Sequence, residues 1–250
     1  MLLECDRISK RFGGVHAVAE LDLAIAPGQV FGLIGPNGAG KTTLVNLISG
    51  HLRVDRGAIR FAGADVTGLA PHALTVRGIA RTFQGVRLFK GLTVLENVLV
   101  GRHVRMRSDV LRRLWPRGAS DRVDRERAGQ LLERLGLGRP NVLAGGLAYG
   151  DQRRVEIARA LASEPRLLIL DEPAAGMNPV ESARLRELMR ALVAEGLTIV
   201  LIEHDVRLVM GTCDRVAVLN FGRKIAEGTP AEIQASPAVR EAYLGTEDAA

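Results

Sequence analysis

Apolar stretches of strand length alternate with helix-patterned stretches over much of this chain. Residues 30–34 are apolar apart from one glycine, which predicts a buried strand, and residues 42–49 carry apolar side chains at helical spacing. Beyond residue 165 the alternation returns, with strands predicted at 167–170, 197–202 and 215–220 and helices at 180–195 and 205–211. Strands that alternate with helices predict an α/β fold with a mainly parallel sheet, covered on both faces.

The rest of the chain divides into an N-terminal strand region and a helical middle. Residues 1–34 read as short strands with turns at 13–14 and 27–28. Further strands are predicted at 58–62 and ending at 81–84, with a turn at 63–65. From 93 to 134 the apolar positions follow helical spacing, and the Arg-rich part, 102–127, is interrupted at 115–118. We interpret this segment as a helical insertion with a solvated middle.

Composition limits the class of protein. At 250 residues and 47% hydrophobic, the chain can bury one large α/β core, with or without an insertion. No apolar run approaches the ~20 residues of a membrane span, and Glu4 and Asp6 argue against a signal peptide. Cys5 and Cys213 make neither a disulfide framework nor a metal cluster, which is typical of a reducing cytosol. The net charge of +6 comes from Arg in an Ala- and Gly-rich chain, so charge alone does not predict nucleic-acid binding.

The most specific motif runs from Gly35 to Thr42, where Gly-Pro-Asn-Gly-Ala-Gly-Lys-Thr fits the phosphate-binding pattern G-x-x-x-x-G-K-[ST]. Its glycines let the backbone curl around an anion, so that inward N–H groups meet the phosphates. Lys41 can reach the outer phosphates as a point charge, and the Thr42 hydroxyl can ligate Mg²⁺. Because the loop joins a predicted strand to a helix start, the helix dipole also favours phosphate there. The motif therefore predicts nucleotide binding.

A second part of the site is predicted where the strand 167–170 ends in Asp171 and Glu172. Carboxylates at the carboxyl end of a parallel strand project into the crevice where open α/β sheets bind ligands. Asp171 is placed to hold Mg²⁺, and Glu172 is placed to orient or deprotonate a water that attacks the γ-phosphorus. Taken alone, the two acids fit a strand that simply exits to the surface as well as they fit a catalytic site. Beside a phosphate loop, the catalytic interpretation is favoured.

Residues 147–154, Leu-Ala-Tyr-Gly-Asp-Gln-Arg-Arg, open a helical stretch shortly before this acidic strand. In this order of motifs the chain resembles the ATP-binding-cassette (ABC) ATPases over nearly its whole length. The resemblance implies a P-loop NTPase (ABC ATPase) core with an N-terminal antiparallel β-subdomain and an inserted helical subdomain. It implies a single ABC domain over 1–250, with the catalytic core in 1–85 and 163–250 and the helical subdomain in 86–162.

The resemblance also implies roles for single residues. Phe12 falls where the family places an aromatic that stacks on adenine, with a core position as the alternative. Gln84 matches the glutamine that senses Mg²⁺ and water, His204 matches the switch histidine that meets the γ-phosphate, and 174–178 matches a loop that contacts the partner subunit. The ATP-binding set is then Phe12, Gly35, Pro36, Asn37, Gly38, Ala39, Gly40, Lys41, Thr42 and Thr43. The catalytic set is Glu172, His204 and Gln84, and the metal set is Thr42, Gln84 and Asp171.

The signature segment, Leu147, Ala148, Tyr149, Gly150 and Asp151, departs from the family's common Leu-Ser-Gly-Gly-Gln. In the family this segment binds the γ-phosphate of the ATP held by the other subunit. Because Ala148 lacks the Ser hydroxyl, one hydrogen bond is lost, and we expect ATP-driven pairing to be weakened rather than abolished. Asp151 suits the helix dipole but brings an anion toward a phosphate. Asn178 stands where many relatives carry Asp at the subunit contact.

Several stretches narrow the resemblance to the larger ATP-binding subunit of bacterial branched-chain amino-acid uptake systems. They are 81–89, 102–127, 148–150, 172–179, 202–206 and 242–245. The resemblance implies an ATPase, with ATP and Mg²⁺ as cofactors, that powers an importer as a peripheral protein on the cytoplasmic face of the inner membrane. The implied partners are a second ABC ATPase subunit, transmembrane permease subunits and, indirectly, an extracytoplasmic solute-binding protein, with no nucleic acid.

Other functions compete with this interpretation. A soluble ABC ATPase acting on nucleic acid or ribosomes is disfavoured, because the chain has neither a long coiled-coil insertion nor a second cassette. An importer ATPase for another small polar solute fits the same motifs. A P-loop kinase or GTPase explains neither 147–151 nor His204, and the guanine motif Asn-Lys-x-Asp does not occur. A homodimer and a heterodimer both stay open, although the resemblance favours a heterodimer with a related, shorter ATPase.

Overall fold

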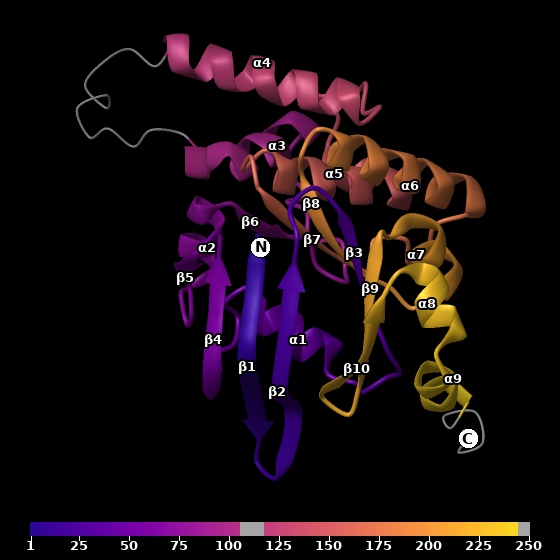
Figure 1. Ribbon diagram of the computed structural model, residues 1–250. Coiled ribbons are helices and arrows are strands. Elements are labelled where there is room, and N and C mark those ends of the chain that lie inside the picture. Colours follow the sequence, from indigo (N-terminus) through magenta and orange to yellow (C-terminus); the bar gives the residue numbers. More distant parts are fainter. Residues whose placement is uncertain (106–117, 245–250) are drawn as a thin grey trace.

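The chain folds around a mainly parallel sheet, as its sequence predicts. The computed structural model describes residues 1–105 and 118–244. In this part of the chain the core sheet has the strand order β10–β9–β3–β8–β7–β6 (Figure 1). Its strands are β3 (Val30–Ile34), β6 (Ile79–Arg81), β7 (Leu167–Asp171), β8 (Thr198–Ile202), β9 (Arg215–Asn220) and β10 (Arg223–Gly228). All pair in parallel except β10, which runs antiparallel to β9. The predicted α/β fold is confirmed.

A second, antiparallel sheet is built mostly from the N-terminal region. Its order is β2–β1–β4–β5, with β1 (Leu3–Phe12), β2 (Val15–Ile25), β4 (Arg56–Phe61) and β5 (Ala64–Asp65). β1 and β2 are longer than the predicted short strands, because register shifts let one hairpin continue past irregular positions. The turn predicted at 13–14 is present, whereas residues 64–65 form β5 instead of belonging to the predicted turn at 63–65.

Helices cover both faces of the core sheet. The helices of the described residues are α1 (Lys41–Ile48), α2 (Pro71–Arg77), α3 (Val94–Arg102), α4 (Gly118–Arg134), α5 (Tyr149–Leu161), α6 (Pro179–Ala194), α7 (Val206–Thr212), α8 (Pro230–Ala235) and α9 (Pro237–Leu244), with 3-10 turns η1 (His103–Arg105) and η3 (Ala144–Gly146). Leu44 of α1 packs in one buried cluster between the two sheets, and Met189 of α6 packs in a second cluster on the opposite face. Side chains alternate along each strand, so β7 contributes Ile169 to the first cluster and Leu168 to the second.

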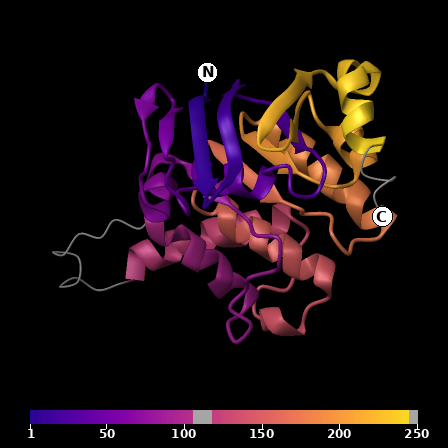
Figure 2. The ribbon, with the colours of Figure 1, turned by 90° about the horizontal axis from the view of Figure 1, so that it is seen from below.

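A third apolar cluster joins α3, α4 and α5 into a separate layer. Val98, Leu132 and Val155, one from each helix, are buried together there. Figures 1 and 2 place this layer at the opposite end of the molecule from the β1–β2 hairpin tip and α9. The helical pattern predicted for 93–134 is interrupted before 115–118, since α3 ends at Arg102 and η1 follows. Most of the Arg-rich part, 106–117, lies outside the described residues.

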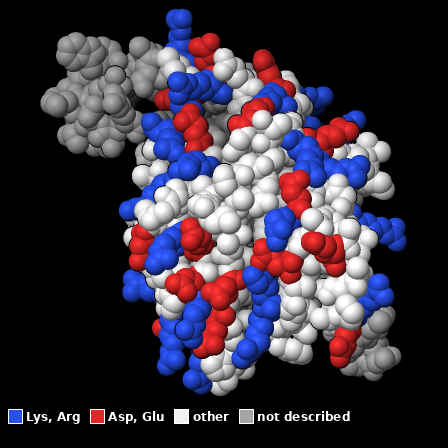
Figure 3. All heavy atoms as spheres, viewed as in Figure 1, with Lys and Arg blue, Asp and Glu red and all other residues white. Residues whose placement is uncertain are grey.

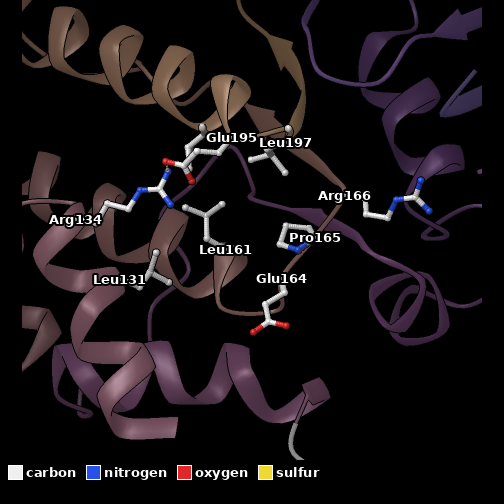
Figure 4. Close-up of a pocket in the computed structure, with 10 residues that line it drawn as sticks. Leu131, Arg134, Leu161, Glu164, Pro165, Arg166, Glu195 and Leu197 are labelled. Carbon is white, nitrogen blue, oxygen red and sulfur yellow. Dashed lines mark ion pairs between the residues drawn. The ribbon is translucent and has the colours of Figure 1, made fainter. Parts of the chain in front are cut away.

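The seam between the helical layer and the core contains a cavity of about 260 Å³. Leu131, Leu161 and Leu197 form its apolar wall, and Arg134 of α4 makes an ion pair with Glu195, just beyond α6 (Figure 4). None of the predicted site residues is among the side chains that line it. The ion pair thus connects the helical layer to the core at a distance from the predicted chemistry.

Charges of both signs are mixed on the face of the molecule drawn in Figure 3. On the face drawn in Figure 3, acidic and basic side chains are interspersed around uncharged areas. Such mixing is typical of a solvated surface rather than of a basic nucleic-acid footprint. No helix within 1–105 or 118–244 has both the length and the apolar character needed to cross a membrane.

Candidate functional site

The phosphate motif forms the connection between β3 and α1. Gly35 has φ 150° and Gly40 has φ 99°, values that side chains rarely allow. Space is also lacking, because a Cβ on Gly35 would lie 2.2 Å from the carbonyl oxygen of Leu219, and one on Gly40 would lie 2.3 Å from that of Ala17. The loop is therefore enclosed by backbone from β9 and β2, and it opens at the start of a helix, where an anion is favoured.

Lys41 lies inside the curl of this loop. Its Nζ donates hydrogen bonds to the carbonyl oxygens of Gly35 at 2.6 Å and Pro36 at 3.0 Å. Burial lowers the pKa of the Lys41 ammonium, while the carboxylates of Glu172 and Asp171 act in the opposite direction. The structure thus brings the predicted phosphate-binding lysine within electrostatic reach of both predicted acids, although their sequence positions are about 130 residues apart.

Glu172 is the meeting point of the three predicted catalytic residues. Gln84 Nε2 donates to Glu172 Oε2 at 2.9 Å, and His204 Nε2 lies 2.8 Å from Oε1. Both carboxylate oxygens are therefore held by side chains that follow other strands of the sheet. Glu172 itself has φ 48°, a left-handed conformation that is rare outside glycine and clusters at functional sites. Its N–H donates to the Ile202 carbonyl at 2.9 Å, which fixes this turn against β8.

Asp171 is held by an arginine that the sequence interpretation missed. Arg81 Nη2 lies 2.8 Å from Asp171 Oδ2, and both side chains are less than a tenth exposed. The other arm of Arg81 donates to Asn46 of α1 at 2.6 Å and to Ser49, the C-cap residue of α1, at 2.9 Å. Arg81 therefore ties β6, β7 and the helix of the phosphate loop together. The sequence feature that could have pointed to Arg81 was its position as a charged residue at the end of an apolar strand.

The residues predicted to hold Mg²⁺ suit that ion in chemistry. Thr42 supplies a hydroxyl oxygen, Asp171 retains Oδ1 beyond its ion pair, and the Gln84 amide retains its oxygen beyond the bond to Glu172. Mg²⁺ prefers hard oxygen ligands and is commonly bound by one or two carboxylates together with substrate phosphates. Within the described ranges no cluster of three His, Cys, Asp or Glu residues forms an all-protein metal site. The donors fit Mg²⁺ bound together with a nucleotide.

The signature segment lies at the start of α5 and faces α6. Ala148 is the N-cap residue and has no side-chain capping bond, and Leu147 is half-buried beside it. Asp151 makes an ion pair with Arg154, which offsets the negative charge noted in the sequence. In the described part of the chain, no hydrogen bond joins 147–151 to the phosphate loop of the same molecule. Ala148 and Tyr149 are exposed at the surface, whereas Gly150 is buried.

Phe12 lies at the end of β1, where it pairs with Val15 across the hairpin. Its side chain is 49% exposed, which excludes the alternative that it is a core residue. Lys10 Nζ lies 5.7 Å from the centre of the ring. An exposed aromatic ring of this kind is suited to stack on a base.

Three further residues support the site without having been predicted. Glu203 is buried and accepts a hydrogen bond from the N–H of Ala174 at 2.8 Å, and burial raises its pKa. Tyr243 of α9 reaches the phosphate loop, where its phenol accepts a hydrogen bond from the backbone of Gly35. Burial raises the pKa of this phenol, and the hydrogen bond acts in the opposite direction. Arg153, fully buried in α5, contacts the backbone of Gln84. These contacts join segments far apart in sequence, which explains why motif spacing did not reveal them.

Comparison with known proteins assigns the arrangement to a family. The family profile described as ABC transporter matches residues 18–175, more than half of the chain. The chain belongs to the ABC transporter family. Its expected identity as an ATP-binding cassette, and therefore a nucleotide-binding ATPase subunit, is confirmed. A second profile, described as Branched-chain amino acid ATP-binding cassette transporter, matches residues 223–249.

Individual relatives of this ABC ATPase agree with the profile. The chain is 45% identical to the high-affinity branched-chain amino acid transport ATP-binding protein BraF of Pseudomonas aeruginosa, covering 98% of each chain. Among solved structures, the ADP conformation of an ATP-binding cassette of an ABC transporter aligns with TM-score 0.86 and 34% identity, over 98% of both chains. A dimeric cassette bound to ADP and Pi aligns with TM-score 0.78 and 25% identity, over 91% of this chain and 98% of that one.

Proposed function

We propose that this chain binds and hydrolyses ATP to power an ABC importer, with branched-chain amino acids as the transported solutes. Two independent matches support the solute class. Relatives named for branched-chain amino acid transport match the chain over nearly its full length, and the profile described by the same solutes matches residues 223–249. The ATPase part of the proposal rests on one observation, the Glu172 carboxylate held by Gln84 and His204 within electrostatic reach of Lys41.

In the proposed reaction, the phosphates of ATP lie on the loop from Gly35 to Thr43, with adenine against Phe12. Lys41 draws the outer phosphates into the loop, because its ammonium is already aimed into the curl by two backbone bonds. Glu172 then orients or deprotonates the attacking water, a role for which a positioned carboxylate is suited. Gln84 and His204 fix both oxygens of that carboxylate, and His204 is about half exposed. In the proposed reaction His204 also meets the γ-phosphate.

Mg²⁺ is assigned to the oxygens of Thr42, Asp171 and Gln84. When bound, it neutralises charge on the phosphates and helps to orient them. Arg81 supports this side of the site, because it holds Asp171 through Oδ2 and leaves Oδ1 for the ion.

Pairing with a second ATPase subunit would complete the site, with residues 147–151 forming its opposite wall in trans. The dimeric cassettes among the similar structures support such pairing. A homodimer and a heterodimer both fit, and the subgroup resemblance favours the heterodimer. We further propose transmembrane permease subunits as partners, an extracytoplasmic solute-binding protein as an indirect partner, and a peripheral position on the cytoplasmic face of the membrane. Within the chain, 86–162 would be the helical subdomain and 1–85 with 163–250 the catalytic core.

Glu172→Gln tests the ATPase part. The amide keeps the size of the side chain but cannot act as a base, so ATP binding should persist while turnover falls by about 10²-fold or more. Glu195→Gln is the matched control, because Glu195 lies at the seam and should leave both quantities unchanged. Near-wild-type turnover in Glu172→Gln would contradict the assignment. Hydrolysis stimulated strongly by DNA or RNA, and not by permease-containing membranes, would contradict the importer.

A further inference from the structure

One buried arginine connects the signature helix to the catalytic residues of the same chain. The Arg153 side chain is 0% exposed, and Glu156 balances its charge at 2.8 Å. Its guanidinium donates to the backbone carbonyls of Phe83 at 2.7 Å and Gln84 at 2.8 Å, and to that of Glu172 at 3.5 Å. The backbone positions of both Gln84 and Glu172 therefore depend on where α5 places this side chain.

Tyr149 forms the other end of this connection, at a position where the family signature commonly has glycine. Its hydroxyl accepts a hydrogen bond from Arg153 Nη2 at 3.2 Å, and the guanidinium carbon lies 5.9 Å from the ring centre. The ring also lies against Gly176, where a Cβ would stand 3.3 Å from Tyr149 Cε1. Tyr149 is 44% exposed. It therefore presents one surface to the outside and another to Arg153.

The packing around the start of α5 leaves little room to absorb a displacement. A Cβ on Gly150 would lie 2.6 Å from Glu181 Oε1. Glu181 is itself fixed, because it forms the capping box of α6 with Asn178. Because this capping box holds the Glu181 side chain against Gly150, a shift in the first turn of α5 presses on the start of α6. The next turn of α5 carries the same shift to Arg153.

We propose that Tyr149 and Arg153 are positioning residues that link the ATP contact of the signature segment in trans to Gln84 and Glu172 in cis. This inference rests on the proposed function, because the second subunit supplies the ATP that the segment meets. Closure of 147–151 on that ATP moves the first turn of α5. Arg153 then moves the carbonyls of Gln84 and Glu172 with it. The site of each chain therefore becomes competent for hydrolysis once the signature segment of that same chain is engaged.

The test compares the full chain with Tyr149→Phe, Arg153→Lys and the double variant. Tyr149→Phe keeps the ring and removes only the hydroxyl, so it is the variant least expected to disturb folding. Arg153→Lys keeps the charge but loses the planar fork that serves several acceptors. Arg105→Lys is the matched control, since Arg105 also donates to two backbone carbonyls, at Ser163 and Glu164, away from the site.

Dimerisation with ATP is measured by light scattering on a Glu172→Gln background, and hydrolysis with the native glutamate in single turnovers. Loss of one hydrogen bond should slow hydrolysis about threefold to tenfold in Tyr149→Phe, with KM and dimerisation unchanged. The double variant should be no slower than Arg153→Lys alone, because both changes act on one connection. Added ATP should protect residues 82–86 and 172–176 from hydrogen exchange less in these variants than in Arg105→Lys.

Two results overturn the inference while leaving the proposed function intact. One is a Tyr149→Phe chain that hydrolyses ATP and gains protection like the parent. The other is a double variant whose loss equals the product of the two single losses, which would mean independent effects. A Glu172→Gln parent that stays monomeric with ATP, alone and with its co-purified partner ATPase, would refute the pairing itself, and the linkage with it.

Discussion

A serine at position 148 would restore one hydroxyl at the start of α5, and the structure predicts two separate consequences. Ala148 is the N-cap residue, with φ −59° and ψ 153° and no side-chain cap. These angles suit a capping serine, whose oxygen accepts from an N–H of the first turn. Ala148→Ser should therefore add about 1 kcal/mol to the free energy of unfolding. For a domain of this size, that raises Tm by about 2–4 °C.

The second consequence concerns pairing. A capping serine uses its oxygen as acceptor, so its hydrogen stays available to donate to the γ-phosphate of the partner's ATP. A hydrogen bond to a charged acceptor contributes about 1.5–3 kcal/mol. ATP-dependent dimerisation should therefore tighten by about tenfold to a hundredfold for each site.

Ala70→Ser provides the matched control for Ala148→Ser. Ala70 is the N-cap of α2, with φ −69° and ψ 154° and likewise no side-chain cap. Both variants should raise Tm by similar amounts in thermal unfolding. On a Glu172→Gln background, light scattering with increasing ATP should show tighter dimerisation for Ala148→Ser alone. Equal dimerisation in the two variants would refute the phosphate contact, and a Tm rise in Ala70→Ser alone would refute the capping geometry.

Other predictions concern burial and the supports of the phosphate loop. Burial raises the pKa of the Cys5 and Cys213 thiols to about 12. At pH 8, iodoacetamide should therefore label the folded chain far more slowly than the unfolded one, and equal rates would contradict this. Because unfolding restores thiol pKa values of about 8.5, the two thiols should also make stability fall as pH rises above that value. Arg81→Met should lower the free energy of unfolding by about 3–5 kcal/mol, because it leaves Asp171 buried without its partner. A denaturant titration measures this loss, and a value below about 1 kcal/mol would count against a desolvated pair. Tyr243→Phe removes a hydrogen bond to the phosphate loop and should weaken ATP binding about threefold to tenfold. Calorimetry measures the affinity for ATP, and an unchanged affinity would contradict this prediction.

Much of the site was predictable because its residues occur at the ends of strands. Gly35–Thr42 follows one apolar run and Asp171 another, and parallel strands place such ends along one edge of the sheet. A capping box at Thr229 and Glu232, with Pro230 between them, was also readable as a helix start, although α8 was not predicted.

The remaining features depend on contacts between distant segments. Arg81 meets Asp171 across 90 residues, and Arg153 meets Gln84 across 69. Neither pair has a spacing that a sequence pattern can reveal, because tertiary packing alone brings the partners together. In the sequence, Tyr149 was assigned to the signature segment, where it departs from the usual glycine. In the structure its ring and hydroxyl have specific neighbours, Gly176 and Arg153.

Transport by the reconstituted complex tests the central claim most directly. The chain would be co-purified with its permease subunits, placed in liposomes containing the solute-binding protein, and supplied with ATP. We predict ATP-dependent uptake of leucine, isoleucine or valine with the wild-type chain, and loss of that uptake with Glu172→Gln although ATP remains bound. Undiminished uptake with Glu172→Gln, or no uptake of any branched-chain amino acid by an active wild-type complex, would contradict the account.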